Sequence, residues 1–300
     1  MTIRRGQATP TRGSLRHPMP DFTHEGHRLA YTVYGTGPRT CVLLHGLLLS
    51  QKMHRPLAKA LARRGNRVIT LDLLGHGQSD RPHDMAAYSM PFFGEQTIAL
   101  LDHLEVDEAV LAGTSLGANA ALEAAAAHPD RVRGMVVEMP VLDNALLGCA
   151  IAFTPLMVAL TFGAPAMKGV SWLTRRLPTG RFWGADILLD TVRQQPGPSA
   201  AVLQGLFFGR VAPHREVRKT IEAPALVIGH DRDPVHPFSD CDALVTELPH
   251  ARLLRADSLL ELRLSPERLT TEIGEFLDEC WKPRHKAGGG APRTRAAGAA

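Results

Sequence analysis

The chain has few cysteines, and their spacing excludes the usual cysteine-rich sites. Only four occur in 300 residues, far apart and with no Cys-x-x-Cys pair: Cys41, Cys149, Cys241 and Cys280. A disulfide framework or a cysteine-based zinc site needs closer pairing. We therefore expect reduced thiols and a cytoplasmic location. The 14 histidines also lack paired ligand spacing, so we expect no metal and no cofactor.

An apolar run behind the N-terminal arginines is missing too, which predicts neither a secretory nor a twin-arginine signal. Aromatic residues make up only 5% of the chain, whereas glycine and proline number 27 and 22. This composition is typical of a fold with many short connections between strands and helices. With 44% hydrophobic residues, the chain is long enough to bury a sizeable core.

Acidic residues are absent from both ends of the chain, and this explains its basic character. Residues 1–20 and 281–300 carry nine lysines and arginines, so the net charge of +4 leaves −5 for the residues between them. Both ends are rich in Gly, Pro, Thr and Ala without apolar periodicity, which predicts disordered tails. The basic pI near 9.0 therefore does not indicate a nucleic-acid surface, and we expect no nucleic-acid partner.

Between the tails, strand-like and helix-like patterns alternate. Alternation of this kind predicts an α/β fold with a mostly parallel central sheet of about eight strands and helices on both faces. The pattern covers residues 21–140 and resumes over 215–280. The interruption at 141–214 indicates a helical insertion after the sixth strand.

The insertion contains an unusually long uncharged stretch. Residues 144–167 carry no charge, which is long enough to span a bilayer. Prolines and glycines interrupt it, however, and a single span would place strands of one sheet on opposite sides of the membrane. We therefore predict an apolar helical lid over a pocket, with shallow membrane contact as an alternative. The side chains expected to form much of an apolar wall are Phe153, Met157, Phe162, Trp172, Trp183, Phe207 and Phe208.

The stretch LAGTSLGANA places Ser115 between Gly113 and Gly117. An apolar strand leads into Ser115 and an alanine-rich helix leads away, the setting that a Gly-x-Ser-x-Gly nucleophile requires. Glycine at both flanks leaves room for a strained turn. Ser115 could alternatively serve only as a helix cap.

At this point the chain resembles the α/β-hydrolase fold family over roughly residues 21–280. Besides GTSLG, the stretches LLHGLLLS, LDLLGHGQSD and PALVIGHDRDPVHP match the family in order. The resemblance implies that the backbone N–H groups of Leu47 and Leu116 form an oxyanion hole. It also implies that His45 and Gly46 shape the turn before Leu47, with His45 structural.

The resemblance places the catalytic acid after the strand ALVIGH. Asp233, which precedes a proline, matches best, and Asp231 is the second candidate because the loop is one residue longer than the family pattern implies. Glu138, at the end of an earlier strand, occupies a region that holds the acid in some relatives. A loop aspartate can equally be a solvated turn former.

The expected histidine after the last strand is missing. That passage reads ADSLLELRLSPERL, and no histidine occurs between His250 and His285. The base could come instead from His236, His230 or His83, of which His236 fits best because its loop lies on the active face. We nevertheless expect Leu259 or a neighbour to occupy the histidine site and Asp233 to face it without an imidazole.

These features favour a hydrolase of a small apolar ester, thioester or lactone that uses Ser115, with activity weakened if the base is displaced. Two alternatives stay open: a non-catalytic ligand-binding or interaction module, and a cofactor-free, lyase-like enzyme. The sequence indicates neither the substrate nor the oligomeric state.

Overall fold

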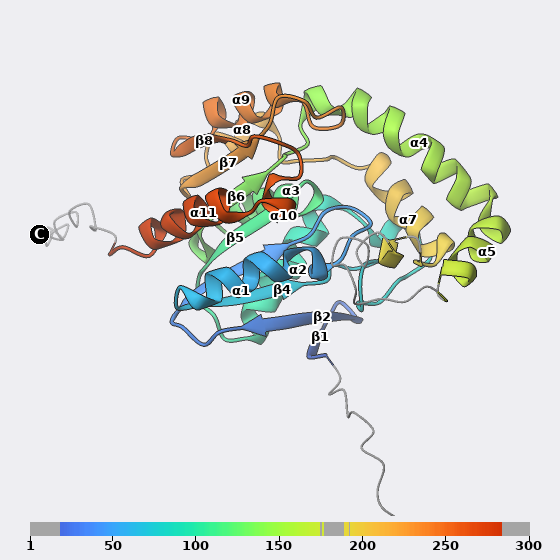
Figure 1. Cartoon of the computed structure of the whole chain (residues 1–300), viewed down its shortest axis with the longest axis horizontal. Helices are drawn as coiled ribbons and strands as arrows, with labels where there is room; N and C mark the ends of the chain where they lie inside the picture. Colours follow the sequence, from blue (N-terminus) through green and yellow to red (C-terminus); the bar gives the residue numbers. More distant parts are fainter. Residues whose placement is uncertain (1–18, 175, 177–188, 192, 284–300) are drawn as a thin grey trace, which may run out of the picture.

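A computed structural model describes residues 19–174, 176, 189–191 and 193–283. Its centre is an eight-stranded sheet in the order β1-β2-β4-β3-β5-β6-β7-β8 (Figure 1). From β4 to β8 all neighbouring strands are parallel, whereas β1 and β2 are antiparallel. The strands are β1 (Asp21–His24), β2 (His27–Tyr34), β3 (Arg39–Leu44), β4 (Asn66–Leu71), β5 (Ala109–Thr114), β6 (Val132–Glu138), β7 (Ala225–Gly229) and β8 (Ala251–Arg255).

Helices cover both faces of the sheet, and each face has its own apolar core. On one face α1 (Arg55–Arg63) and α11 (Glu267–Cys280) contribute Leu61 and Phe276. On the other, α2 (Met90–His103), α3 (Leu116–Ala127) and α9 (Phe238–Glu247) contribute Phe93, Leu122 and Leu244. The shorter helices are η1 (Gln51–His54), η2 (Met85–Ala87), η3 (Pro129–Arg131), α8 (Arg215–Arg218) and α10 (Glu261–Leu264). The predicted α/β fold is confirmed.

The predicted insertion follows β6, the sixth strand, and most of its described residues are helical. It contains η4 (Asp143–Ala145), α4 (Leu146–Phe162), α5 (Ala164–Thr174) and α7 (Pro196–Phe207), which arch beside the sheet in Figure 1. Pro155 lies inside α4 without ending it, and the break comes at Gly163. The predicted tails fall almost wholly outside the described residues, as does Trp183.

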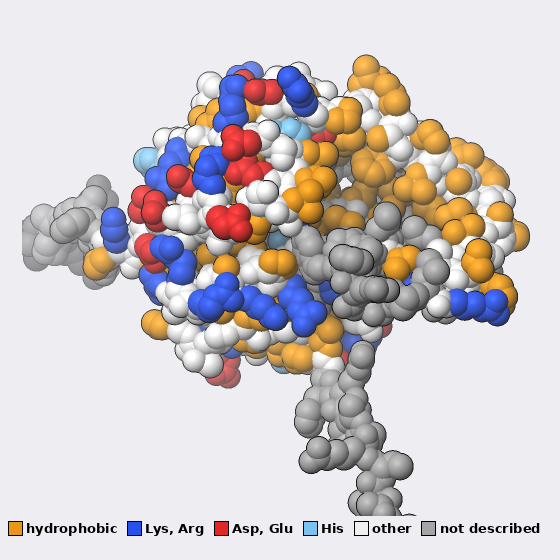
Figure 2. Space-filling model, in the orientation of Figure 1, with side chains coloured by type: hydrophobic (Ala, Val, Ile, Leu, Met, Phe, Trp, Pro, Cys, Tyr) orange, Lys and Arg blue, Asp and Glu red, His pale blue; other side chains and the backbone are white. Residues whose placement is uncertain are grey.

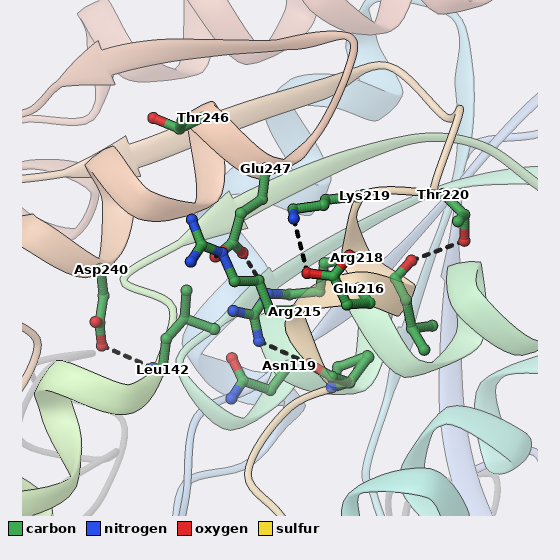
Figure 3. A network of polar contacts seen from close by, with 12 residues as sticks. Asn119, Leu142, Arg215, Glu216, Arg218, Lys219, Thr220, Asp240, Thr246 and Glu247 are labelled. Carbon is green, nitrogen blue, oxygen red and sulfur yellow. Dashed lines mark hydrogen bonds and ion pairs between the residues drawn. The ribbon is translucent and has the colours of Figure 1, made fainter.

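Polar contacts fix both ends of the insertion to the α/β core. The Asn119 side chain of α3 donates to the carbonyls of Val141 (2.7 Å) and Val211 (2.5 Å) and accepts from the Val141 N–H. The Asp240 carboxylate of α9 accepts from the backbone N–H groups of Leu142, Asn144 and Ala145. Figure 3 shows Asp240 beside Leu142, with Asn119 nearby.

A buried ion pair lies just after the insertion returns to the α/β core. The Arg218 guanidinium donates to the Glu247 carboxylate at 2.5 Å and to the carbonyl of Pro213 at 2.6 Å (Figure 3). Both charged side chains are about 5% exposed. Because each charge has a partner, the pair can be buried without leaving an uncompensated charge.

The turn between β5 and α3 depends on close backbone approach at two glycines. A Cβ atom on Gly113 would lie 2.1 Å from the carbonyl of Gly117, and one on Gly117 would lie 2.2 Å from the carbonyl oxygen of Leu44 in β3. These distances are far below van der Waals contact. Glycine at both positions therefore lets α3 begin directly against two strands.

We expect Gly117→Ala to lower the free energy of unfolding by roughly 2 kcal/mol or more, because overpacking against fixed backbone outweighs the gain in helix propensity. The matched control is Gly169→Ala in α5, where a Cβ atom meets nothing within 4 Å. The control should be neutral or slightly stabilising. Urea unfolding of the three proteins measures this, and equal stability of the two variants would contradict the packing argument.

Candidate active site

Ser115 occupies a strained turn at the end of β5. Its backbone has φ 52° and ψ −110°, a left-handed conformation that non-glycine residues rarely adopt. Its N–H donates to the carbonyl of Glu138 (2.9 Å), and its carbonyl accepts from the N–H of Asn119 (3.0 Å). The neighbouring strand and the first turn of α3 thus hold the strained conformation in place.

An imidazole lies within hydrogen-bond distance of the Ser115 hydroxyl. The His236 Nε2 atom is 2.9 Å from Ser115 Oγ, and His236 Nδ1 is 2.7 Å from Asp233 Oδ2. A carboxylate at Nδ1 requires a proton there, so Nε2 accepts from the serine hydroxyl. The expectation that Asp233 would face no imidazole is therefore wrong, and His236 is the candidate base that the structure brings to Ser115.

The loop from Asp233 to His236 folds around the Asp233 carboxylate. Oδ1 accepts from the backbone N–H of Val235 (2.8 Å) and of His236 (3.0 Å), while Oδ2 accepts from the His236 ring. Burial raises the pKa of Asp233, but these hydrogen bonds outweigh it and lower the pKa to about 2. The carboxylate is therefore ionised near neutral pH and fixes the orientation of the ring.

Helix α4 of the insertion packs directly on this loop. A Cβ atom on Gly148 would lie 2.8 Å from the carbonyl oxygen of Pro234. Glycine at this position therefore allows a close approach between the insertion and the loop that carries Asp233 and His236. Gly148 is one of the glycines that interrupt the uncharged stretch 144–167, and the sequence alone did not indicate this contact.

The other candidate acids have different partners. Asp231 forms an ion pair with Arg255 at the surface (2.8 Å). Glu138 is buried and accepts from Arg263 (2.7 Å) and from the Thr114 hydroxyl (2.5 Å). Neither carboxylate bonds an imidazole among the described residues.

The remaining candidate bases and Leu259 are not hydrogen-bonded to the Ser115 hydroxyl, whose imidazole partner is His236. His230 Nε2 is 3.4 Å from Asp233 Oδ2, on the same carboxylate as His236. His83 is exposed, and its ring lies beside Gly197 at the start of α7. Leu259, expected to replace a catalytic histidine, is 42% exposed.

The two residues expected to form an oxyanion hole line the same cavity as Ser115. Leu116 is the first residue of α3, where backbone N–H groups lack intrahelical acceptors. Leu47 follows a turn held by the buried His45 ring, whose Nδ1 bonds the Gly46 carbonyl and whose Nε2 accepts from the Leu73 N–H. Because Nε2 accepts a hydrogen bond from the Leu73 N–H, this ring carries no proton on Nε2. Burial lowers the pKa of His45 in the same sense.

The cavity beside Ser115 is apolar and has a volume of about 410 Å³. None of the described residues that line it is charged. The insertion supplies much of the wall, and the core supplies the floor. The lining residues are Leu47, Met90, Ser115, Leu116, Val141, Leu146, Cys149, Ala150, Phe153, Leu203, Leu206, Phe207, Gly209 and Val211.

The predicted aromatic wall is only partly correct. Phe153 and Phe207 line the cavity. Phe162, Trp172 and Phe208 are instead 57–81% exposed on the outside of the insertion. Met157 packs against a small cluster around Leu160, and Trp183 lies outside the described residues.

Neither the cavity nor its surroundings resemble a metal or phosphate site. Within the described ranges no group of three or more His, Cys, Asp or Glu side chains is arranged to hold a metal ion. Among the described residues that line the cavity, there is no lysine or arginine to bind a phosphate-bearing cofactor. Its chemistry is that of a serine, an imidazole and backbone N–H groups in apolar surroundings.

Comparison with known proteins supports the same architecture. Residues 40–157 match the family model described as "alpha/beta hydrolase fold". The chain is 36% identical over 105 residues to a 2-hydroxymuconate semialdehyde hydrolase from Pseudomonas sp. (strain CF600), covering 35% of this chain and 34% of that protein. It is 30% identical over 258 residues to the dihydrolipoyllysine-residue acetyltransferase component of an acetoin cleaving system from Pseudomonas putida, covering 78% and 64%.

Among solved structures, the enol-lactonase from Burkholderia xenovorans LB400 superposes with a TM-score of 0.69 at 22% identity. The superposition covers 86% of this chain and all of the enol-lactonase chain. The chain spans less than two thirds of the length of these curated relatives. At 22% identity, the likeness to the enol-lactonase structure concerns the fold alone.

The low pKa of Asp233 predicts a specific dependence of stability on acid. Because the folded-state pKa of about 2 lies below the unfolded value of about 3.9, ionised Asp233 stabilises the folded protein above pH 4. This contribution should disappear as the pH falls from about 4 to about 2. Urea midpoints of wild type and Asp233→Asn should therefore differ at pH 6 and converge toward pH 2. A difference that is independent of pH would contradict the assignment.

Proposed function

Because the chain belongs to the α/β-hydrolase fold family, we propose that it is a serine hydrolase of a small apolar ester, thioester or lactone. The observation that carries this proposal is the connected series from Ser115 to His236 to Asp233, with contacts of 2.9 and 2.7 Å. A nucleophile, a base and a group that orients the base are the parts that such chemistry needs. The relatives named hydrolase and enol-lactonase are consistent with it.

In the proposed acylation step, Ser115 Oγ attacks the substrate carbonyl while His236 Nε2 takes the hydroxyl proton. The carbonyl oxygen becomes an oxyanion, which the N–H groups of Leu47 and Leu116 stabilise. The intermediate then collapses, the bond to the leaving group breaks, and His236 returns the proton to the leaving oxygen or sulfur. Asp233 stays ionised and holds the imidazolium in place.

In the proposed second step, water replaces the leaving group. His236 takes a proton from the water as the water oxygen attacks the acyl carbonyl. The intermediate then collapses, the bond between the acyl carbon and Ser115 Oγ breaks, and His236 returns the proton to Oγ, which releases the carboxylic acid. No cofactor enters this sequence. The insertion acts as a lid that supplies apolar walls, so we propose that the acyl group or ring is apolar.

The bonded Ser115–His236 pair disfavours the non-catalytic alternative, because a binding module needs no activated serine. It also removes the reason to expect weak activity, since Asp233 already has an imidazole to orient. Cytoplasmic location remains part of the proposal and rests on the reduced cysteines.

Removing either member of the reacting pair should abolish activity. We expect Ser115→Ala and His236→Ala each to lower kcat/KM on a p-nitrophenyl ester by roughly 10³-fold or more, and the double variant to be no worse than either single one, because the residues act as a unit. Labelling of Ser115 by a fluorophosphonate should be lost in both single variants. The matched control is His230→Ala, which removes the other imidazole near Asp233.

Two results would contradict the mechanism. One is a wild type that neither reacts with the fluorophosphonate nor hydrolyses esters, which would favour the binding module. The other is a His230→Ala variant as inactive as His236→Ala with normal stability, which would assign the base to His230.

The cavity wall predicts how acyl-chain preference should change. Ala150 of α4 lines the cavity, so Ala150→Phe should reduce its volume and lower kcat/KM for hexanoate esters by roughly tenfold relative to acetate esters. Ala152→Phe on the exposed side of the same helix is the matched control and should leave the ratio unchanged. An equal change of the ratio in both variants would show that substrates bind elsewhere.

A further inference from the structure

Helix α4 has no polar face. Its 17 residues contain no charged side chain, and the only polar ones are Thr154 and Thr161. A helix that is apolar all round is normally buried in a large core or in a membrane. Here only 11% of the most apolar window in the segment 143–162 is buried inside the protein. Most of this apolar surface therefore lies in contact with solvent unless something covers it.

The two sides of α4 have different neighbours. Leu146, Cys149, Ala150 and Phe153 follow the i, i+3, i+4, i+7 spacing of one helical face and line the cavity beside Ser115. The nearly opposite face is exposed, with exposed fractions that reach 81%. Its residues are Leu147 (72%), Ile151 (68%), Val158 (47%) and Phe162 (81%).

The exposed apolar surface continues onto α5. Val170, Trp172 and Leu173 are 45%, 57% and 60% exposed. Figure 2 shows hydrophobic side chains along the margin of the molecule that α4 and α5 form, whereas the opposite side carries mixed acidic and basic residues. We call the surface of Leu147, Ile151, Val158, Phe162, Trp172 and Leu173 the outer face. A contiguous patch of this kind is unusual on a monomeric soluble protein and indicates an interaction site.

The two helices that carry the outer face contain no acidic residue. In sequence, α4 and α5 together have one charged residue, Lys168. The Arg176 guanidinium lies over the Trp172 ring, 3.6 Å from its centroid. An apolar surface with a tryptophan at its edge and a guanidinium over that tryptophan matches the hydrocarbon boundary and anionic headgroups of a lipid bilayer.

The attachments of α4 to the core rule out a membrane-spanning orientation of this helix in the folded protein. Its N-terminal end follows η4, whose N–H groups are bound by Asp240 of α9. Near its C-terminal end Leu160 is 6% exposed and packs with Leu203 of α7. Only the outer face is therefore available to lipid, which is the geometry of a helix lying along the interface.

We propose that the outer face binds the surface of an anionic phospholipid bilayer, with α4 parallel to the membrane and its inner side over the cavity. This proposal concerns binding and stands independently of the proposed hydrolysis. If both hold, the cavity beside Ser115 lies one helix diameter from the lipid, so an apolar substrate dissolved in the bilayer could reach it along α4. The apolar cavity lining would then continue the apolar path from the membrane.

Vesicle sedimentation tests the proposal with the full chain. Wild type should bind vesicles that contain phosphatidylglycerol and bind pure phosphatidylcholine vesicles more weakly. Leu147→Glu/Phe162→Glu should lower the partition coefficient by roughly tenfold or more, because it places two charges in the apolar contact and adds repulsion from the lipid. The matched control is Leu259→Glu/Leu264→Glu, which adds the same charge at leucines that are 42% and 71% exposed on another surface.

A fluorescence measurement reports the outer face directly. The emission of Trp172, obtained as the difference between wild type and Trp172→Phe, should shift to shorter wavelength when phosphatidylglycerol vesicles are added. Ester hydrolysis in solution without lipid should be the same in Leu147→Glu/Phe162→Glu as in wild type. This comparison shows that the variant folds and separates loss of binding from loss of catalysis.

Three outcomes would overturn the proposal. Equal vesicle binding by the two double variants would assign binding to the basic chain ends. No binding by a wild-type protein that is folded and monomeric would show that lipid is not the partner. A wild-type dimer that Leu147→Glu/Phe162→Glu dissociates, with no vesicle binding, would show that a second copy of the chain covers the outer face.

Discussion

The active-site geometry depends on one carboxylate, that of Asp233. It accepts two backbone N–H groups of its own loop and the Nδ1–H of His236. The backbone contacts bend the four-residue loop, and the ring contact selects the tautomer whose Nε2 can accept the Ser115 proton. Asp233 and His236 lie three residues apart, so a single loop positions both the acid and the base. The resemblance to the family implied two separate loops, one after β7 and one after β8. The candidate base thus comes from the loop after β7 and not from the chain after β8.

This arrangement explains why sequence reasoning found the nucleophile more easily than the base. The signals that identify Ser115 are all local in sequence. They are Gly113, Gly117, the strand before the serine and the helix after it. The position of His236 depends on how the 233–236 loop bends and on how far it lies from β5, which is a property of the assembled sheet. The resemblance to the family implied a histidine after the last strand. Because of that expectation, His236 was named only as a candidate base and Asp233 was expected to lack an imidazole partner.

The fold was predictable because its signals are periodic and repeated. Alternating strands and helices fix a mostly parallel sheet, and the loss of that alternation after residue 140 marks the insertion. The contacts that hold the insertion were not predicted. Asn119 was a usable signal, since it is a polar residue in an otherwise alanine-rich helix and lies one turn after Ser115. Its side chain joins Val141 and Val211, so the two ends of the insertion meet one helical turn from the nucleophile.

The same contacts constrain what α4 can do. If α4 moved away from the cavity, its apolar inner side would be exposed to water. The free-energy cost of that exposure grows with the apolar area exposed. Asn119 and Asp240 fix the insertion at its ends, and Gly148 brings α4 against the loop of Asp233 and His236. Movement of α4 would therefore disturb the site itself. The inner side of α4 lines the cavity, so the outer face is the side that can contact a partner. Because the outer face has no charged residue, that partner must be apolar where it meets α4.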